Sequence, residues 1–415
     1  MTKPSQSPGT HGRSVLYLSL DGMTDPLGGS QVLPYLQGLS AHGHRIVLLS
    51  CEKAARFERG QGRVRRICEQ SGIVWHPLPY RRSPRLLAGL RNIRALKRAA
   101  VRLHRIYGFE IAHCRSYVPA MAGLILKRRF GVRLLFDMRG FWADERVDGR
   151  LWPQSHPIYR LLYRRAKALE AELLESADHV ISLTESGRRI LQSWPNPASR
   201  PRAVTTIPCC VDFGAFRLPD IDARRLARRT LGIPAGGKVV AYLGSIGTWY
   251  MLDEMLDFFA CYARRHVGAR LLFVTQDEPE AIRSAAQRRG LDPESLIIRS
   301  ASREDVPALM VAADLGLFFI KPCFSKQASS PTKMGEMLAL GLPIVTNAGV
   351  GDVAEIVAET GVGVAIQSFD SHQYDAAIDR IDSIGLRPEE IRARALPWFD
   401  VNEGIDRYDR VYRML

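Results

Sequence analysis

The sequence of 415 residues lacks a long apolar run. Its most apolar stretches, among them residues 117–126 and 315–320, are far shorter than the roughly 18 residues that a membrane-spanning helix needs. The opening residues are polar and rich in proline, glycine and serine, without the apolar segment of a secretory signal. We therefore expect residues 1–13 to form a disordered tail and the protein to be cytoplasmic.

Cysteine pairs of the kind that bind zinc are also missing. The seven cysteines show no CxxC spacing, and their odd number leaves one over. Reduced thiols without a zinc site are the simplest interpretation. Since no acidic cluster that suits a divalent cation is evident either, we expect neither a metal nor another cofactor.

Acidic residues are fewer than basic ones, with 43 Asp and Glu against 58 Lys and Arg, which gives a net charge of +15. The excess is concentrated between Arg56 and Arg105. Nucleic acid, anionic lipid and phosphorylated substrates are all compatible partners for such a surface. Nucleic acid is the least favoured, because no signature of a DNA- or RNA-binding domain is present and no aromatic residues alternate with the basic ones.

The rest of the sequence alternates short apolar runs with segments of helical periodicity. Residues 14–20 and 45–52 are predicted strands on either side of a helix, and the same pattern continues to residue 212. It begins again at residue 238, after a Pro- and Arg-rich connector over residues 213–237. This predicts an α/β fold of two doubly wound, Rossmann-like domains, residues 14–212 and 238–399. Residues 400–415 are predicted to form a helix with one apolar face.

The stretch "SSPTKMGEMLALGLP" predicts a helix that follows Ser330 as N-cap, with Pro331 at its first position and Gly341 just beyond its end. Lys333 then falls in the first turn, where exposed N–H groups already make the potential positive. Glu336 lies on the same face. Either the two side chains form a solvent-exposed pair, or a diphosphate binds at the helix terminus with Lys333 while Glu336 accepts hydrogen bonds from a ribose.

Two other groups of residues follow predicted strands. Gly28 and Gly29 stand in "DPLGGSQ", where a glycine-rich turn either lets backbone approach a phosphate or only reverses the chain. Polar side chains that end two later strands are candidates for acceptor contacts or proton transfer, namely His113, Arg115, Asp137 and Arg139. The alternative for these four is a hydrogen-bonded structural role.

The predicted helix over residues 86–107 carries a stripe of arginines beside its apolar stripe. The apolar stripe is expected to pack on the sheet, as in an ordinary surface helix. The density of arginine suggests that the outer face meets anionic lipid headgroups. The residues concerned are Arg91, Arg94, Arg98, Arg102 and Arg105.

Five segments together, "DPLGGSQVLPYLQGLSAHGH", "IPCCVDFGAF", "AYLGSIGTWY", "VPALMVAADLGLFF" and "SPTKMGEMLALGLPIVTNAGVGDVAEIV", resemble the retaining glycosyltransferases of family 4, which have the GT-B fold. The resemblance implies two domains facing a cleft, with a nucleotide diphosphate sugar held mainly by the second and with residues 400–415 crossing back to the first. It also implies metal-independent transfer of a hexose-type sugar with retention of configuration, in which the departing phosphate helps to take the proton of the acceptor.

Carried onto this sequence, the family pattern makes Glu336 the ribose-binding residue and His113 the acceptor-side histidine. The pattern also implies donor contacts from the first loop, from the strand ends of the second domain and from the turn before the helix. These residues are Gly28, Gly29, Ser245, Arg299, Ser330, Thr332, Lys333 and Glu355.

The sequence departs from the family pattern at three positions. Ala328 stands where the family often has a glutamate, and Ser245 and Tyr250 stand in place of a basic pair. A diphosphate leaving group needs positive charge. We therefore expect Lys333 to replace that pair, with help from Lys326, Lys321 and Arg303, so that Lys333, Glu336 and His113 are the catalytic candidates.

Two other functions are compatible with these departures, a sugar-nucleotide epimerase of the same fold and a catalytically silent subunit that binds a partner enzyme. For a transferase, the basic helix favours a lipid-linked or oligosaccharide acceptor, as in bacterial envelope or exopolysaccharide assembly. The protein would then work peripherally on the inner face of the cytoplasmic membrane.

Overall fold

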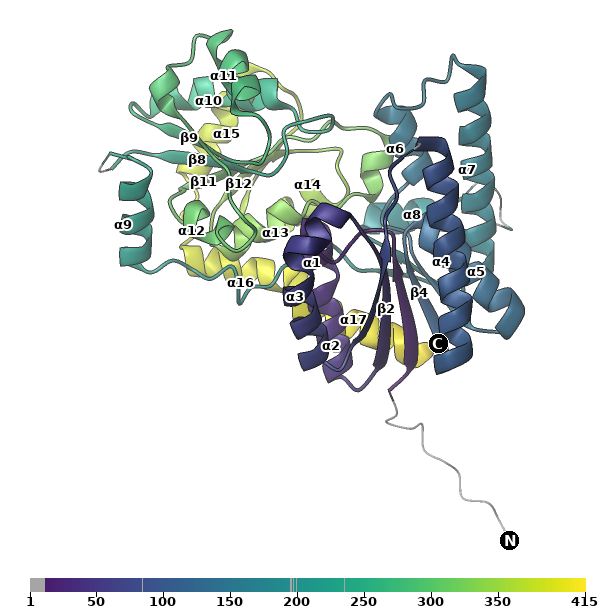
Figure 1. The fold of residues 1–415 in the computed structure, drawn as a ribbon. Coiled ribbons are helices and arrows are strands. Elements are labelled where there is room, and N and C mark those ends of the chain that lie inside the picture. Colours follow the sequence, from purple (N-terminus) through teal and green to yellow (C-terminus); the bar gives the residue numbers. More distant parts are fainter. Residues whose placement is uncertain (1–11, 84, 195, 197, 199, 235) are drawn as a thin grey trace.

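The first domain of this computed structural model is built on a parallel sheet (Figure 1). The structure describes residues 12–83, 85–194, 196, 198, 200–234 and 236–415. Within these ranges the first sheet has seven strands in the order β3-β2-β1-β4-β5-β6-β7. Their bounds are β1 (Ser14–Ser19), β2 (Arg45–Glu52), β3 (Val74–Pro79), β4 (Ile111–Arg115), β5 (Arg133–Asp137), β6 (His179–Ser182) and β7 (Val204–Thr206).

Helices cover both faces of this sheet. Successive residues of a strand point to opposite faces, so each strand contributes side chains to two cores. Val15 and Tyr17 of β1 pack in a core with α2 and α3, whereas Leu16 and Leu18 pack in a second core with α4, α5 and α7. The helices of this part are α1 (Pro26–Gln31), α2 (Leu33–Ala41), α3 (Ala54–Gln70), α4 (Arg85–Tyr107), α5 (Tyr117–Phe130), α6 (Trp142–Asp148), α7 (Pro157–Ser176) and α8 (Glu185–Gln192).

The second domain repeats this architecture. Its six described strands are parallel, in the order β10-β9-β8-β11-β12-β13. They are β8 (Val239–Leu243), β9 (Arg270–Val274), β10 (Leu296–Arg299), β11 (Leu315–Leu317), β12 (Ile344–Asn347) and β13 (Gly363–Ile366). The helices are α9 (Ile221–Thr230), α10 (Leu252–Arg265), α11 (Pro279–Gln287), α12 (Val306–Met310), α13 (Thr332–Ala339), α14 (Val353–Thr360) and α15 (Ser371–Asp382). The predicted pair of doubly wound domains is confirmed.

The last two helices, α16 (Pro388–Phe399) and α17 (Val401–Met414), return the chain to the first domain. Figure 1 shows α17, in yellow, against the first domain beside α2. Ile405, Tyr408, Val411 and Tyr412 belong to the core that also contains β1 and α2. Gly38 of α2 is needed there, since a Cβ at this position would lie 2.3 Å from Ile405 Cδ1. The predicted crossing helix is therefore confirmed.

Side chains and backbone groups join the two domains at several points. Asp352 accepts hydrogen bonds from the backbone N–H groups of Glu185 and Ser186, at the start of α8. Asp148 accepts from the N–H of Ser325, and Thr184 donates to the carbonyl of Gln327. The first turn of α8 thus receives its anionic partner from the other domain.

Several local predictions need correction. The segment expected to be a connector contains α9, whose Arg224 and Arg228 bind Asp314 of the second domain. Of the expected disordered tail, residues 1–11 lie outside the described residues, whereas Arg13 pairs with Glu110 at 3.0 Å.

In the described part of the chain, no helix has both the length and the apolar character that crossing a membrane requires.

Candidate functional site

The helix with Lys333, α13, begins one residue later than the sequence predicts. Pro331 is its N-cap, and Ser330 does not cap it with a side-chain hydrogen bond. Ser330 instead accepts a hydrogen bond from the backbone N–H of Cys209, at 3.1 Å, and so contacts the first domain. Gly341 has φ +74° and lies just beyond the helix end, as predicted. Thr332 is the first residue of α13 and is partly exposed.

Lys333 is enclosed by aromatic rings. Its Nζ donates to Tyr242 Oη at 2.8 Å and lies 4.1 Å and 3.6 Å from the ring centroids of Tyr242 and Tyr250. Gly244, with φ +114°, leaves room for the amine, because a Cβ there would be 3.2 Å from Nζ. Burial lowers the pKa of Lys333 well below its ordinary value, and the Glu336 carboxylate only partly opposes this shift. The ring faces attract a cation but do not neutralise it.

Glu336 is buried, with 3% of its surface exposed, and pairs with Arg303. The Arg303 guanidinium also lies 4.9 Å from the ring centroid of Phe216. The interpretation in which Lys333 and Glu336 form a solvent-exposed pair is therefore wrong. Arg303 was expected to help Lys333 bind the diphosphate. Its guanidinium instead pairs with the Glu336 carboxylate, which is expected to bind the ribose. A ribose that binds Glu336 has to share it with Arg303 or displace it.

The loop after β8 carries Ser245 and Tyr250 at the two positions where the family has a basic pair. The ring of Tyr250 contacts the Lys333 amine, so the positive charge near this loop belongs to Lys333 of α13. Ser245 donates from Oγ to Asp277 at 2.7 Å. At these two positions, Tyr250 therefore contacts the Lys333 amine with its ring, and Ser245 hydrogen-bonds to the carboxylate of Asp277.

The expected base-binding region lies beside a cavity of about 560 Å³. Arg299, at the end of β10, lines it together with Ser300, Gln276 and Asp305. Glu304, the neighbour of Asp305 in the chain, pairs with Arg63 of α3 at 2.7 Å. This contact bridges the two domains next to the cavity.

The segment from Phe324 to Ala328 belongs to the interface between the domains. Lys326 is bound to Glu145 of α6 at 2.6 Å, and its Nζ lies 3.8 Å from the ring centroid of Trp249. Ala328 is buried among side chains of the first domain, which leaves no room for the glutamate that the family often has here. Lys326 therefore acts as an interface residue, while Lys321 is exposed.

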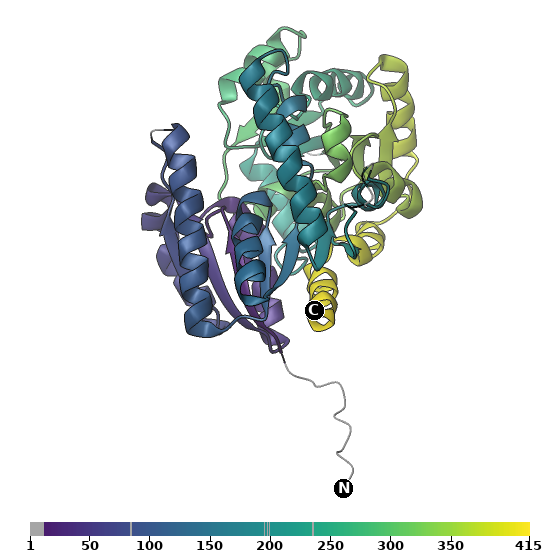
Figure 2. The same ribbon diagram turned by 90° about the vertical axis from the view of Figure 1, so that its right-hand side faces the viewer.

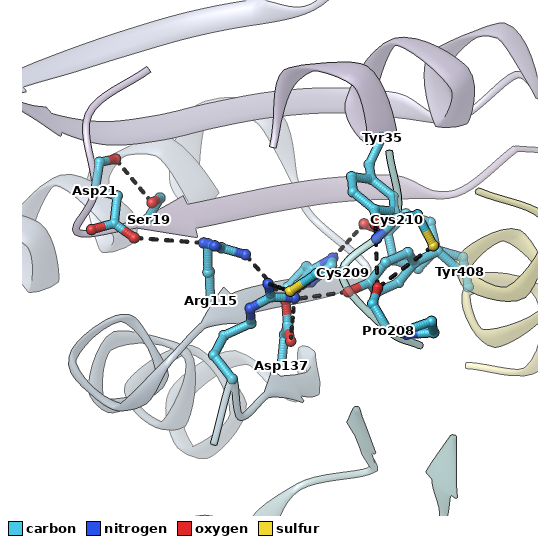
Figure 3. A network of polar contacts seen from close by, with 12 residues as sticks. Ser19, Asp21, Tyr35, Arg115, Asp137, Pro208, Cys209, Cys210 and Tyr408 are labelled. Atoms are coloured by element: carbon cyan, nitrogen blue, oxygen red, sulfur yellow. Dashed lines mark hydrogen bonds and ion pairs between the residues drawn. The ribbon is translucent and has the colours of Figure 1, made fainter. Parts of the chain in front are cut away.

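The polar side chains that end β4 and β5 lie close together (Figure 3). His113 is buried, and its Nδ1 lies 2.7 Å from Tyr412 Oη. Its Nε2 is 3.7 Å from Asp137 Oδ2. Burial lowers the pKa of His113, and Asp137 only partly opposes the shift. His113 thus lies in a buried network, in which its Nδ1 contacts Tyr412 and its Nε2 has no hydrogen-bond partner among the described residues.

Charged groups around Asp137 continue this network toward the cleft. Burial alone would raise the pKa of Asp137, but the charges of Arg139, His113 and Arg115 together lower it. Arg139, with φ +60°, donates to Cys209 Sγ at 3.2 Å, and the backbone N–H of the same Cys209 donates to Ser330. Figure 3 shows Arg115 between Asp137 and Asp21, so it is the member of the network nearest to the first loop.

The remaining predicted donor residues are scattered. Gly28 and Gly29 lie in the short helix α1 rather than in an open turn, and a Cβ at Gly28 would be 2.1 Å from the carbonyl oxygen of Gly22. Gly28 therefore permits close packing of backbone. Glu355 is exposed on α14 and lines a cavity of about 390 Å³ with Ser330 and Arg407, a cavity that neither Lys333 nor Glu336 lines.

Sequence reasoning missed the aromatic residues of the site. Tyr242, Trp249 and Tyr250 stand at both ends of the glycine-containing turn "YLGSIGTWY", and they hold Lys333 and Lys326. Aromatic residues that flank a segment expected to bind phosphate are the signal that would have revealed them. Among the described residues, no group of three or more His, Cys, Asp or Glu is placed to hold a metal ion.

Known proteins resemble this chain in both domains. Residues 28–209 match the family described as "Glycosyl transferase 4-like domain", and residues 223–395 match "Glycosyl transferases group 1". A D-inositol 3-phosphate glycosyltransferase of Segniliparus rotundus is 26% identical over 295 residues, which are 70% of this chain and 61% of that protein. The corresponding protein of Acidothermus cellulolyticus is 24% identical over 72% of this chain and 66% of its own length. The match thus spans about two thirds of these relatives or less.

Solved structures share the fold over nearly the whole chain. Sucrose-phosphate synthase of Thermosynechococcus elongatus superposes with a TM-score of 0.70 and 16% identity, over 97% of this chain and 98% of that one. Anabaena HepE in complex with UDP and glucose gives a TM-score of 0.69 and 16% identity, over 97% and 100% of the chains. With both domains matched in sequence and in architecture, this chain belongs to the GT4-type glycosyltransferases with the GT-B fold.

Proposed function

We propose that this protein transfers a hexose-type sugar from a nucleotide diphosphate sugar to a saccharide acceptor with retention of configuration. One observation carries the proposal, namely the buried Lys333 amine at the first turn of α13, which has no carboxylate within ion-pair distance in the described part of the chain. An anion bound there would gain both the amine and the free N–H groups of the helix terminus.

Each residue has a distinct role in this mechanism. Lys333 stabilises the charge that develops on the diphosphate as its bond to the sugar breaks. Because an adjacent anion favours the ammonium form, diphosphate binding raises the pKa of Lys333 that burial has lowered. Glu336 accepts the ribose hydroxyls, and the departing phosphate takes the proton of the acceptor hydroxyl on the same face of the sugar. No metal takes part in this scheme.

The relatives suggest which donor to try first. Structures of Anabaena HepE hold UDP, UDP-glucose, and UDP with glucose. A uridine donor is therefore the starting point, with the cavity beside Arg299 as the place for the base. We further propose that residues 14–212 with residues 400–415 form the acceptor domain and that residues 238–399 form the donor domain.

The acceptor in this proposal is a lipid-linked or oligosaccharide chain, and the protein works at the inner face of the cytoplasmic membrane. The support is the outer face of α4. Its five arginines are exposed, and none has an ion-pair partner among the described residues. These are Arg91, Arg94, Arg98, Arg102 and Arg105.

The test combines nucleotide binding with turnover. UDP, GDP, dTDP and ADP are titrated calorimetrically without added metal, and transfer from the sugar nucleotide of the base that binds is then measured. Lys333→Ala is expected to lose nearly all transfer while it still binds nucleotide, and the control Lys238→Ala, an exposed lysine of the same domain, is expected to keep both. Unchanged turnover in Lys333→Ala would refute the proposal.

Two further outcomes identify the alternative functions. An isomerised donor sugar without any acceptor indicates an epimerase. No binding of any of the four nucleotides at millimolar concentration indicates a chain without a donor site, which acts through a partner.

A further inference from the structure

The N-terminal half of α7 exposes apolar side chains to solvent. Ile158, Leu161 and Leu162 have 63%, 53% and 41% of their surface exposed, and Leu151, in the loop before the helix, has 52%. The spacing of the three helical residues places them on one stripe. The buried residues of α7, Ala166, Glu170, Leu173 and Leu174, all lie further along the helix, so its N-terminal half is not covered by the domain.

The same segment is strongly basic. No acidic residue occurs between Asp148 and Glu170, whereas four exposed arginines do. None of the four has an ion-pair partner in the part of the chain that the structure describes. The four are Arg150, Arg160, Arg164 and Arg165. We call this segment, residues 150–165 with its exposed leucines, isoleucine and arginines, the α7 tip.

The α7 tip lies on the same face of the first sheet as the arginines of α4. Helix α5 packs between α4 and α7, and all three share one core. In Figure 2, which looks onto this side of the molecule, α7 crosses in front in teal, and α4 stands to its left in blue. The apolar stripe and the two arginine sets are therefore carried by helices that cover the same face of the first sheet.

We propose that the α7 tip is a membrane-docking surface, in which Leu151, Ile158, Leu161 and Leu162 enter the headgroup region of an anionic bilayer while the neighbouring arginines bind lipid phosphates. Apolar side chains at the boundary of the acyl region, flanked by cations, are the combination that holds an interfacial helix on such a membrane. Docking places this face, rather than the second domain, against the lipid.

Charge decides against a second copy of this chain as the occupant. In a twofold-symmetric dimer the same patch meets itself, so the four arginines of one copy would face those of the other with no acidic residue of the patch between them. Anionic headgroups remove this repulsion, and they satisfy the guanidiniums with charge-assisted hydrogen bonds.

The docking surface is connected to the second domain through helix α6. Helix α6 directly precedes the α7 tip, and its Glu145 and Asp148 bind Lys326 and the backbone of Ser325 in the second domain. The proposal does not depend on the transfer reaction, however, because membrane binding is measured with neither donor nor acceptor present.

The experiment is co-sedimentation of the full chain with vesicles of phosphatidylglycerol and phosphatidylcholine in equal parts, and with vesicles of phosphatidylcholine alone. The wild type is expected to bind the anionic vesicles and to lose most of that binding in high salt. The triple variant Ile158→Ser, Leu161→Ser, Leu162→Ser is expected to bind roughly tenfold or more weakly, because its side chains no longer enter the bilayer.

A matched control removes three exposed apolar residues of the other domain, as Ile221→Ser, Leu226→Ser, Val267→Ser. This control is expected to bind like the wild type. Since all six positions are exposed, both variants should melt at the wild-type temperature, which circular dichroism verifies.

Any of four results would overturn the proposal. The first is a wild type that does not bind anionic vesicles at low salt, and the second is equal binding of the wild type to neutral and anionic vesicles. The third is wild-type affinity of the α7 variant for anionic vesicles. The fourth is that the wild type is a dimer, the α7 variant is a monomer, and neither protein binds lipid. The last result would assign the surface to a second copy of the chain.

Discussion

Replacing Lys333 by methionine removes the amine but keeps a flexible side chain of similar length between Tyr242 and Tyr250. In the wild type this amine is buried, and burial lowers its pKa. Two effects on stability oppose each other. The ring contacts of a desolvated cation stabilise by about 2 kcal/mol, whereas the desolvation of an ammonium group costs several kcal/mol. The methionine variant is therefore expected to be at least as stable as the wild type at neutral pH.

The difference depends on pH with a defined sign. Between the lowered pKa of Lys333 and its ordinary value of about 10.4, the unfolded chain binds more protons than the folded one. The free energy of unfolding of the wild type therefore rises with pH across this interval, by about 1.4 kcal/mol for each pH unit. The variant lacks this term, so its advantage shrinks as the pH approaches the upper limit.

Diphosphate binding supplies the sharper assay. An anion beside the amine raises the pKa of Lys333, so at a pH above its lowered value the wild type takes up as much as one proton for each nucleotide bound. Calorimetric titrations in buffers with different ionisation enthalpies measure this uptake. The Lys333→Met variant is expected to bind with no uptake, and to lose about 10²–10³ in kcat when transfer is measured.

The same uptake in wild type and variant would refute the placement of the diphosphate at Lys333, since another group would then be taking up the proton. A wild type that is destabilised by rising pH over the stated interval would contradict the lowered pKa itself. Denaturant titrations of both proteins, followed by circular dichroism at several pH values, provide that check.

Three further predictions concern single side chains. Glu336→Ala is expected to abolish measurable nucleotide binding in a calorimeter and to leave Arg303 without its partner, whereas undiminished affinity would remove Glu336 from the donor site. Tyr412→Phe should lower the free energy of unfolding by about 1–3 kcal/mol in urea titrations, because His113 loses the hydroxyl at 2.7 Å in a buried place; an unchanged midpoint would contradict this. Gly341→Ala should lower the melting temperature, since φ is +74° and its Cβ would lie 2.6 Å from that of Pro388, and a melting temperature at or above the wild-type value would disprove the strain.

The alternation of apolar runs and helical segments predicted the order of strands and helices well. Parallel strands buried on both faces are apolar throughout, as in β1 and β8, and this pattern is local. The crossing helix α17 was predictable for a related reason, because its apolar stripe has no partner within its own segment. The helix α9 was missed because arginines dominate it, and their partner Asp314 is distant in sequence.

The site was predicted in part. The sequence placed Lys333 and Glu336 near the start of α13 and left open whether they pair with each other or bind a diphosphate and a ribose. Arg303 takes Glu336, and aromatic rings take Lys333, because residues three to four apart on a helix can each face a different neighbour in the fold. The contact of His113 with Tyr412 of α17, 299 residues away in the chain, had no signal in the sequence.

The sequence by itself determined the family, the two parallel sheets and the end of α13 before Gly341, since these depend on periodicity, glycine positions and motifs that operate over a few residues. Tertiary structure decided which charges are paired and which remain open. Burial, ion pairing and the pKa of Lys333 depend on groups from β8 and from the loop behind it, about 90 residues away in the chain. Tertiary structure also decided that Ile158, Leu161 and Leu162 of α7 stay exposed, because the part of this helix that packs on its own domain begins only at Ala166.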